Sequence, residues 1–266
     1  MSDVLLVAGL SLAVAAGVMT LTAVAAVRAD RVSVVDVAWG PAFGAVALVC
    51  ALAANDGRSW LLVGLVGVWG ARLSLHILAR SRGHGEDPRY RALLGGSLSE
   101  VGLGVAVRKV FLVQGLAVWL ISLPLQAAAI SDVDRSWVVW LGVGVWVLGV
   151  VFESVGDAQL AAYRADPDRG PVMDRGLWGW TRHPNYFGDS CVWWGIWLAG
   201  GVASGWLPGL VSVLSPIAMT VFLVWVTGAK LLERSMMTRP GYPEYAARTS
   251  MFVPLPPRRG SRTPGG

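Results

Sequence analysis

Long apolar stretches separated by short polar breaks are the feature of this sequence that most constrains its fold. Several of them reach the roughly 20 residues that an α-helix needs to cross a bilayer. Hydrophobic residues make up 55% of the chain and charged residues only 15%, whereas about a quarter of the residues in a soluble domain are charged. The sequence therefore predicts an all-α fold, a polytopic membrane helix bundle with about seven transmembrane helices. The predicted spans are residues 3–27, 33–54, 60–80, 107–130, 136–160, 184–204 and 206–232.

The distribution of arginine and lysine predicts the orientation of these spans. Most of the 22 basic residues lie at or after the ends of spans one, three, five and seven, and the other connections contain only Arg58 and Arg135. Because positively charged loops tend to remain in the cytoplasm, we expect the N-terminus outside and the C-terminus in the cytoplasm. The net charge of +5 is not gathered into a basic run suited to nucleic acid, so we expect no nucleic-acid partner.

Other features of the composition indicate the domain organisation and the cellular location of the protein. We expect a single transmembrane domain over residues 1–254, followed by a flexible tail rich in Pro, Arg and Gly over residues 255–266. Cys50 and Cys191 lie inside apolar stretches without metal-ligand spacing, so we expect packing residues and no metal site. The excess of arginine over lysine, together with abundant Ala, Val and Gly, favours a bacterial plasma (inner) membrane.

Ionisable side chains recur inside the predicted spans, where each costs about 2.5–3.5 kcal/mol. Residues four or seven apart share one face of a helix, as in the pair Glu153 and Asp157. Lipid exposure of such groups would be far costlier than a shared cavity, so we expect a polar cavity that opens to the cytoplasm. Buried ion pairs that set helix register are the alternative. The residues concerned are Asp36, Arg72, His76, Glu153, Asp157, Arg164, Asp189 and Glu233.

The stretch "RHPNYFGD", residues 182–189, places several functional groups where span six begins. Pro184 suits the first turn of a helix, where its missing N–H costs nothing. A helix N-terminus beside the forked guanidinium of Arg182 is a favourable place for an anion or phosphate. Asn185 can bind an amide, and Tyr186 can stack or donate a hydrogen bond. Asp189, about one turn further, is then placed to meet the reactive end of the ligand.

Several motifs resemble a known family over residues 31–257. They are "VDVAWG" (35–40), "ARLSLHILARSRGHGEDPRY" (71–90), "FESVGDAQLAAYRADPDRG" (152–170), "VMDRGLWGWTRHPNYFGDSCVWWG" (172–195) and "LLERSMMTRPGYPEYAARTSMFVP" (231–254). The chain resembles the DUF1295 branch of the steroid 5α-reductase-like membrane proteins. Its "RHPNY-x-GD" is also similar to the signature of sterol C14- and Δ7-reductases, and the shorter R-H-P-x-Y-x-G core is shared with isoprenylcysteine and phospholipid methyltransferases.

The resemblance implies that NADPH binds in the cytoplasmic half and that a lipid-soluble substrate enters from the membrane. It implies Asp189 and Tyr186 as catalytic residues. The residues that we expect to bind the cofactor are Arg72, Glu153, Asp157, Arg164, Arg182, His183, Asn185, Tyr186, Glu233, Tyr242, Tyr245 and Arg248. The residues that we expect near the substrate are Asp36, Trp39, Trp69 and His76.

Two differences from the steroid enzymes narrow the range of expected substrates. Those enzymes carry a Gln-Glu pair on span two and a Tyr on span three, whereas the matching positions here are Ala38-Trp39 and Trp69. The acid that polarises the steroid ketone is therefore missing, and a 3-oxo steroid is not the expected substrate. The segment around Tyr242, Tyr245 and Arg248 has two interpretations, an interfacial amphipathic helix and a lid over the cofactor.

The sequence favours an NADPH-dependent reductase of a carbon–carbon double bond in a steroid, isoprenoid or acyl substrate. In such a reaction the cofactor supplies the hydride, and the protein supplies orientation and a proton. The alternative is an S-adenosylmethionine-dependent methyltransferase of the isoprenylcysteine or phospholipid type. A third possibility is a non-enzymatic membrane protein such as a small transporter. The sequence does not determine the substrate, the hydride acceptor or the oligomeric state.

Overall fold

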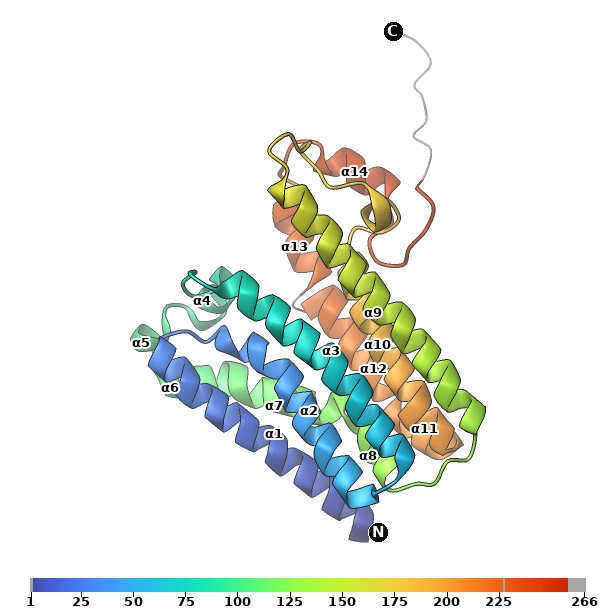
Figure 1. Ribbon diagram of the computed structural model, residues 1–266. Helices are drawn as coiled ribbons and strands as arrows, with labels where there is room; N and C mark the ends of the chain where they lie inside the picture. Colours follow the sequence, from blue (N-terminus) through green and yellow to red (C-terminus); the bar gives the residue numbers. More distant parts are fainter. Residues whose placement is uncertain (1, 227, 258–266) are drawn as a thin grey trace. The chain divides into compact units, whose positions relative to one another are not determined.

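The computed structural model describes residues 2–226 and 228–257, and these residues are built from helices (Figure 1). Six helical stretches are long and apolar enough to cross a membrane: Asp3–Ala29, Val34–Ala54, Gly57–Ser81, Leu103–Ile121, Ser136–Ala165 and Trp206–Met236. In the described residues no strand is present, and a single isolated bridge pairs Thr181 with Ser250. The predicted all-α, polytopic membrane bundle is confirmed.

The sixth predicted span, residues 184–204, corresponds to a shorter helix. Helix α10, Pro184–Gly200, has 17 residues, at the short end of the range that crosses a bilayer. The fourth span also differs from its prediction, because the continuous helical stretch starts at Leu103 and ends at Ile121. It ends there because Pro124 lies in the first turn of the next helix, and proline cannot continue a preceding helix.

Contacts divide the chain into two compact units, residues 1–142 with 196–215 and residues 143–195 with 216–266. Helices α9, α10 and α12 contribute residues to both. Most of the predicted tail, residues 258–266, lies outside the described part, and the single domain over residues 1–254 stays a prediction. The first unit contains α1 (Ser2–Ala29), α2 (Val34–Ala54), α3 (Gly57–Ser81), α4 (Pro88–Leu94), α5 (Leu98–Val101), α6 (Leu103–Ala106), the π-turn η1 (Val107–Phe111), α7 (Leu112–Ile121), α8 (Leu123–Ala129), η3 (Val202–Ser204) and α11 (Trp206–Ser212).

In the first unit, α2 packs between α1 and α3 (Figure 1). Gly40 of α2 and Gly70 of α3 let the two backbones touch, because a Cβ on Gly40 would lie 2.2 Å from the Gly70 carbonyl oxygen. The core at this crossing is aromatic, with Phe43 and Trp69 fully buried and their rings 5.8 Å apart. Small residues at the contact thus fix the crossing, as is common in membrane helix pairs.

A buried arginine fixes the opposite end of α3 in the same unit. The Arg58 guanidinium donates to the carbonyl oxygens of Ala128 (2.8 Å) and Ser131 (2.5 Å) and to the Ser204 hydroxyl (2.8 Å). These partners belong to the end of α8, the following loop and η3, so one side chain joins three segments. Arg58 is one of the two basic residues in the connections predicted to lie outside the cytoplasm, and its buried contacts give it a structural role.

The second unit is built around α9 and α10. Its elements are α9 (Ser136–Ala165), the 3₁₀ turn η2 (Gly176–Gly179), α10 (Pro184–Gly200), α12 (Leu214–Val221), the π-turn η4 (Phe222–Val226), α13 (Ala229–Met236) and α14 (Tyr242–Arg248). Helices α9 and α10 approach closely at two glycines, because a Cβ on Gly188 would lie 2.5 Å from the Gly149 carbonyl oxygen. This crossing brings the first turns of α10 against the middle of α9.

Candidate functional site

The stretch at residues 182–189 spans a loop and the start of α10, as the sequence predicts. Pro184 is the first residue of α10. The residues before it pair with the chain near its C-terminus: the Arg182 amide donates to the Ser250 carbonyl (2.9 Å), and the Thr181 hydroxyl donates to the Phe252 carbonyl (2.8 Å). The C-terminal segment after α14 is therefore part of the candidate site.

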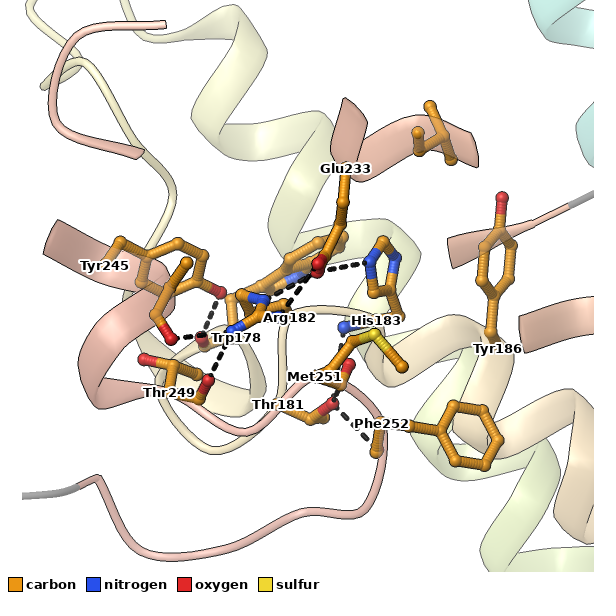
Figure 2. A network of polar contacts seen from close by, with 12 residues as sticks. Trp178, Thr181, Arg182, His183, Tyr186, Glu233, Tyr245, Thr249, Met251 and Phe252 are labelled. Carbon is orange, nitrogen blue, oxygen red and sulfur yellow. Dashed lines mark hydrogen bonds and ion pairs between the residues drawn. The ribbon is translucent and has the colours of Figure 1, made fainter. Parts of the chain in front are cut away.

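The guanidinium of Arg182 is hydrogen-bonded to other residues of the chain (Figure 2). Its Nε and Nη2 donate to the two carboxylate oxygens of Glu233 at 2.6 and 2.9 Å, and its Nη1 donates to the Ala246 and Thr249 carbonyls, both at 2.7 Å. The two charged side chains are only 11% and 14% exposed. Arg182 thus connects α13 and the end of α14 to the start of α10.

His183 completes what we call the Arg182 cluster, which consists of Arg182, His183 and Glu233. The buried His183 ring lies with Nε2 3.1 Å from Glu233 Oε1. It stacks on the ring of Tyr186, with centroids 5.4 Å apart and an interplanar angle of 3° (Figure 2). The cluster therefore orients the first turn of α10, where Tyr186 lies.

A second polar contact joins α10 to α9. The Asn185 side-chain amide donates to a carboxylate oxygen of Asp157 at 3.3 Å. Glu153, one turn earlier on α9, is buried beside Gly188, because a Cβ on that glycine would lie 2.9 Å from Glu153 Cβ. Asp189 is also buried, one turn after Asn185. The structure thus brings Asn185 and Asp157 together, while Arg182 points toward Glu233 and α14.

Beside α14 lies a polar pocket of about 290 Å³, between the loop that follows α9 and α14 itself. Two predicted site residues, Tyr245 and Arg248, line it, whereas Arg164 does not. The ion pair of Arg248 with Asp174, 2.5 Å long, forms part of its wall. The lining residues are Tyr163, Asp166, Arg169, Gly170, Pro171, Val172, Met173, Asp174, Arg175, Gly241, Tyr245 and Arg248.

Hydrogen bonds hold the pocket wall in place in three successive layers. The turn η2 lies on α9, because the Trp178 indole donates to the Gly156 carbonyl (2.9 Å) and the Leu177 amide donates to Gln159 Oε1 (3.0 Å). Helix α14 in turn lies on η2, because the Tyr245 hydroxyl donates to the Trp178 carbonyl (2.6 Å). The Arg182 cluster holds the far end of α14. Helix α14, with Tyr245, is thus held as a wall of the pocket, and its interpretations as an interfacial helix and as a lid both stay predictions.

Both tyrosines of α14 remain protonated near neutral pH. Burial, followed by the negative charge of Glu233, raises the pKa of Tyr242 to about 12. Burial also raises the pKa of Tyr245, and the neighbouring Tyr242 adds to this effect. Neutral phenols are hydrogen-bond donors, which is the role that Tyr245 has toward Trp178.

Among the pocket residues that sequence reasoning missed are Arg169, Asp174 and Arg175. All three lie in the long connection between α9 and α10, which is rich in Arg, Asp, Gly and Pro. Charged residues in such loops are usually solvated, so no spacing rule distinguishes them. The bend that turns them toward α14 uses Gly176 at a φ of +59°, which favours glycine.

Five predicted site residues belong to the first unit: Asp36, Trp39, Trp69, Arg72 and His76. Asp36 accepts a hydrogen bond from the Tyr90 hydroxyl and pairs with Arg89 at 3.2 Å, so two residues of α4 engage its carboxylate. Burial and the charge of Asp36 raise the pKa of Tyr90, which therefore stays a donor.

The aromatic residues of this set have structural contacts. The Trp39 indole donates to Gln114 Oε1 at 2.7 Å, and Trp69 is fully buried. Trp69 thus belongs to the core of the first unit, and Trp39 joins α2 to α7. The roles of Arg72 toward the cofactor and of His76 toward the substrate stay predictions.

These observations define an integral membrane protein of all-α class with a polar site at one end of its second unit. The model of the family described as "Protein of unknown function (DUF1295)" matches residues 23–249. The chain therefore belongs to this family, as its motifs predict. No curated protein and no solved structure matches the chain. The steroid 5α-reductase-like character of the chain stays a prediction.

Proposed function

We propose that this protein is a membrane-embedded, NADPH-dependent reductase that reduces a carbon–carbon double bond in a lipid-like steroid, isoprenoid or acyl substrate. One observation carries the proposal. A single compact unit contains the Asp157–Asn185 contact, the Arg182 cluster and the arginine-lined pocket. We further propose that the unit's polar end faces the cytoplasm of a bacterium, where soluble NADPH is available.

The residues of the pocket fit the phosphate-bearing part of such a cofactor. Arg169, Arg175 and Arg248 line it, and the guanidinium fork matches phosphate geometry. Tyr163 adds a half-buried aromatic ring on which a base can stack. A volume of about 290 Å³ is at the lower end for ligand pockets, so the pocket would hold one nucleotide half of a dinucleotide.

The start of α10 would serve the reactive half. NADPH, when bound, supplies the hydride. The Asn185 amide and the Asp157 carboxylate already meet at 3.3 Å, and together they offer donors and acceptors for amide and hydroxyl groups. Asp189 is buried on the same helix, one turn after Asn185. We assign to Asp189 the delivery of the proton to the substrate, with Tyr186 as the neighbouring donor.

Arg182, His183 and Glu233 would act on the cofactor through α14. Four hydrogen bonds already engage the Arg182 guanidinium. These bonds hold the helix that supplies Tyr245 and Arg248 to the pocket. We therefore propose that the Arg182 cluster is a positioning group for the pocket wall.

A methyltransferase is the second candidate, and the pocket volume favours it. About 290 Å³ suits a ligand with a single nucleoside, such as S-adenosylmethionine, better than a whole dinucleotide. The two candidate cofactors differ in phosphate, since NADPH carries phosphate groups and S-adenosylmethionine carries none. Three lining arginines are more than an uncharged ribose and a methionine carboxylate require, so the reductase remains the leading proposal.

The test is a calorimetric titration of the detergent-purified full chain with NADPH, NADH and S-adenosylmethionine. We expect NADPH to bind and Arg175→Ala to weaken it at least tenfold. The matched control is Arg135→Ala, an exposed arginine that pairs with the adjacent Asp134, and it should bind as the wild type does. Binding of S-adenosylmethionine but not NADPH would establish the second candidate in place of the first.

A further inference from the structure

A groove of about 570 Å³ lies in the first unit between α1 and the segment formed by α6, η1 and α7. Both walls belong to stretches that are long and apolar enough to cross a membrane, Asp3–Ala29 and Leu103–Ile121. The groove is therefore a feature of the membrane-embedded part, separate from the polar site of the second unit.

Small residues and a π-turn keep this groove open. On α1, Ala16 and Ala23 line it, and on α7 Gly115 lines it. A Cβ on Gly115 would lie 3.3 Å from Met19 Cγ, so a larger residue would crowd the groove. Opposite α1, the π-turn Val107–Phe111 interrupts the regular helix, and such turns occur often at functional sites.

The chemistry of the lining is apolar along its length and basic at one end. Thr20 is polar, and its hydroxyl donates to the Ala16 carbonyl within α1 at 2.8 Å. Arg28 is the charged residue of the lining; it lies in the last turn of α1 and is exposed. Among the described residues, its side chain makes no hydrogen bond or ion pair.

The nearby acidic group is already engaged. Asp30, two residues after Arg28, accepts hydrogen bonds from the Ser99 amide (3.1 Å) and the Ser99 hydroxyl (3.2 Å). Arg108 follows Val107 of the groove wall and adds a second exposed positive charge on η1. The positive charges of Arg28 and Arg108 exceed the one negative charge of Asp30, so this end of the groove is electropositive, and the predicted orientation places it at the cytoplasmic surface.

We propose that this groove binds one acyl chain of an anionic phospholipid of the surrounding bilayer, with the lipid phosphate against Arg28. An apolar cavity within the membrane favours hydrocarbon over water, and its volume falls in the range of small-molecule sites. A single guanidinium at one end of a long apolar groove matches a phosphate on a hydrocarbon chain. The phospholipid site is independent of the proposed reductase activity.

The test is native mass spectrometry of the full chain after detergent exchange and titration with phosphatidylglycerol or phosphatidylcholine of identical acyl chains. We expect a preference for phosphatidylglycerol, which Arg28→Gln should reduce about fivefold because one arginine near a lipid surface contributes roughly that factor. Arg28→Lys should retain most of the preference.

A matched pair of alanines tests the apolar part. Ala16 and Ala25 are both exposed on α1, and nine residues place them on opposite faces of the helix. Ala16→Phe should lose the bound lipid, and Ala25→Phe, outside the groove, should keep it. Equal binding of both phospholipids by the wild type would overturn the proposal. Lipid retention by Ala16→Phe would also overturn it. So would a wild-type mass of two protein copies that Ala16→Phe converts to one copy, because a second copy of the chain would then occupy the groove.

If Ala16→Phe does not fold, Arg28→Gln decides, because an exposed side chain can be changed without repacking. A variant that folds and keeps the full preference for phosphatidylglycerol would then refute the role of Arg28. A variant that loses the preference while keeping the melting temperature of the wild type would support it.

Discussion

Arg182 and Glu233 form a two-pronged ion pair, with Nε–Oε1 and Nη2–Oε2 distances of 2.6 and 2.9 Å, between residues 51 positions apart in the chain. Both side chains are largely shielded from water, so each charge depends on the other for solvation. The pair holds α13 and α14 against the start of α10. The order of the candidate site therefore depends on a contact between two residues that do not themselves line the pocket.

Arg182→Ala should destabilise the second unit by about 3 kcal/mol, because removing one partner leaves a largely buried charge without its counter-ion. Arg182→Lys should fall between this variant and the wild type, since an ammonium keeps the charge but not the fork. Thermal unfolding in detergent, followed by circular dichroism, measures both.

The control for this prediction is Arg135→Ala, whose side chain is 46% exposed and whose removal should change stability by less than about 0.5 kcal/mol. An Arg182→Ala protein that melts like the wild type but no longer binds NADPH would contradict the positioning role. It would instead make Arg182 a direct ligand of the cofactor.

Gly188→Ala should destabilise the crossing of α9 and α10. The added Cβ would lie 2.6 Å from the Glu153 amide nitrogen, and overpacking of this kind costs about 1–3 kcal/mol. The displaced helix would also separate Asn185 from Asp157, so NADPH affinity should fall with the melting temperature.

Gly144→Ala on α9, the other helix of this crossing, is the matched control, since a Cβ there meets no heavy atom within 4 Å. Alanine in a helix interior is favoured over glycine by about 0.5–1 kcal/mol, so this variant should be as stable as the wild type or more so. Equal melting temperatures for Gly188→Ala and Gly144→Ala would refute the close crossing.

Ionic strength should weaken the binding of NADPH. The pocket recognises phosphate through Arg169, Arg175 and Arg248, which line an open loop region, and charges at a surface are screened by salt over about 10 Å at 0.1 M. Titration at rising salt should show a steady loss of affinity, and a smaller loss in Arg169→Ala. A salt-independent affinity would place the cofactor phosphates away from these arginines.

Stability should decline at alkaline pH, in part because of Tyr242. The pKa of this phenol is raised from 10.0 to about 12 in the folded protein, first by burial and then by the charge of Glu233. Above pH 10 the unfolded chain loses this proton while the folded chain keeps it, so stability present below pH 10 is lost as the pH rises toward 12.

Tyr242→Phe should therefore show a shallower fall in melting temperature between pH 10 and 12 than the wild type. Tyr245 has a raised pKa as well, so the variant retains part of the slope. Identical slopes for Tyr242→Phe and the wild type would show that Tyr242 ionises normally in the folded state.

The sequence predicted much of the architecture and part of the site. The spans were predictable because a lipid environment demands long apolar helices, and Pro184 marked the start of α10. The pairing of Asn185 with Asp157 agrees with the predicted polar face. By contrast, no local rule indicated that Trp69 would be core or that Asp36 would bind Tyr90, because both outcomes depend on neighbours that are distant in the chain.

The sequence alone predicts the membrane-spanning helical class and the family. Segments of about 20 apolar residues cross hydrocarbon as helices, because a helix satisfies all its backbone hydrogen bonds within one segment, and the family motifs are short local stretches. Tertiary structure alone decided that Arg182 binds Glu233 rather than facing outward, and that Arg169 and Arg175 join Tyr245 around one pocket. The physical reason is that a charged side chain takes the best partner within reach, and folding determines which partners are within reach.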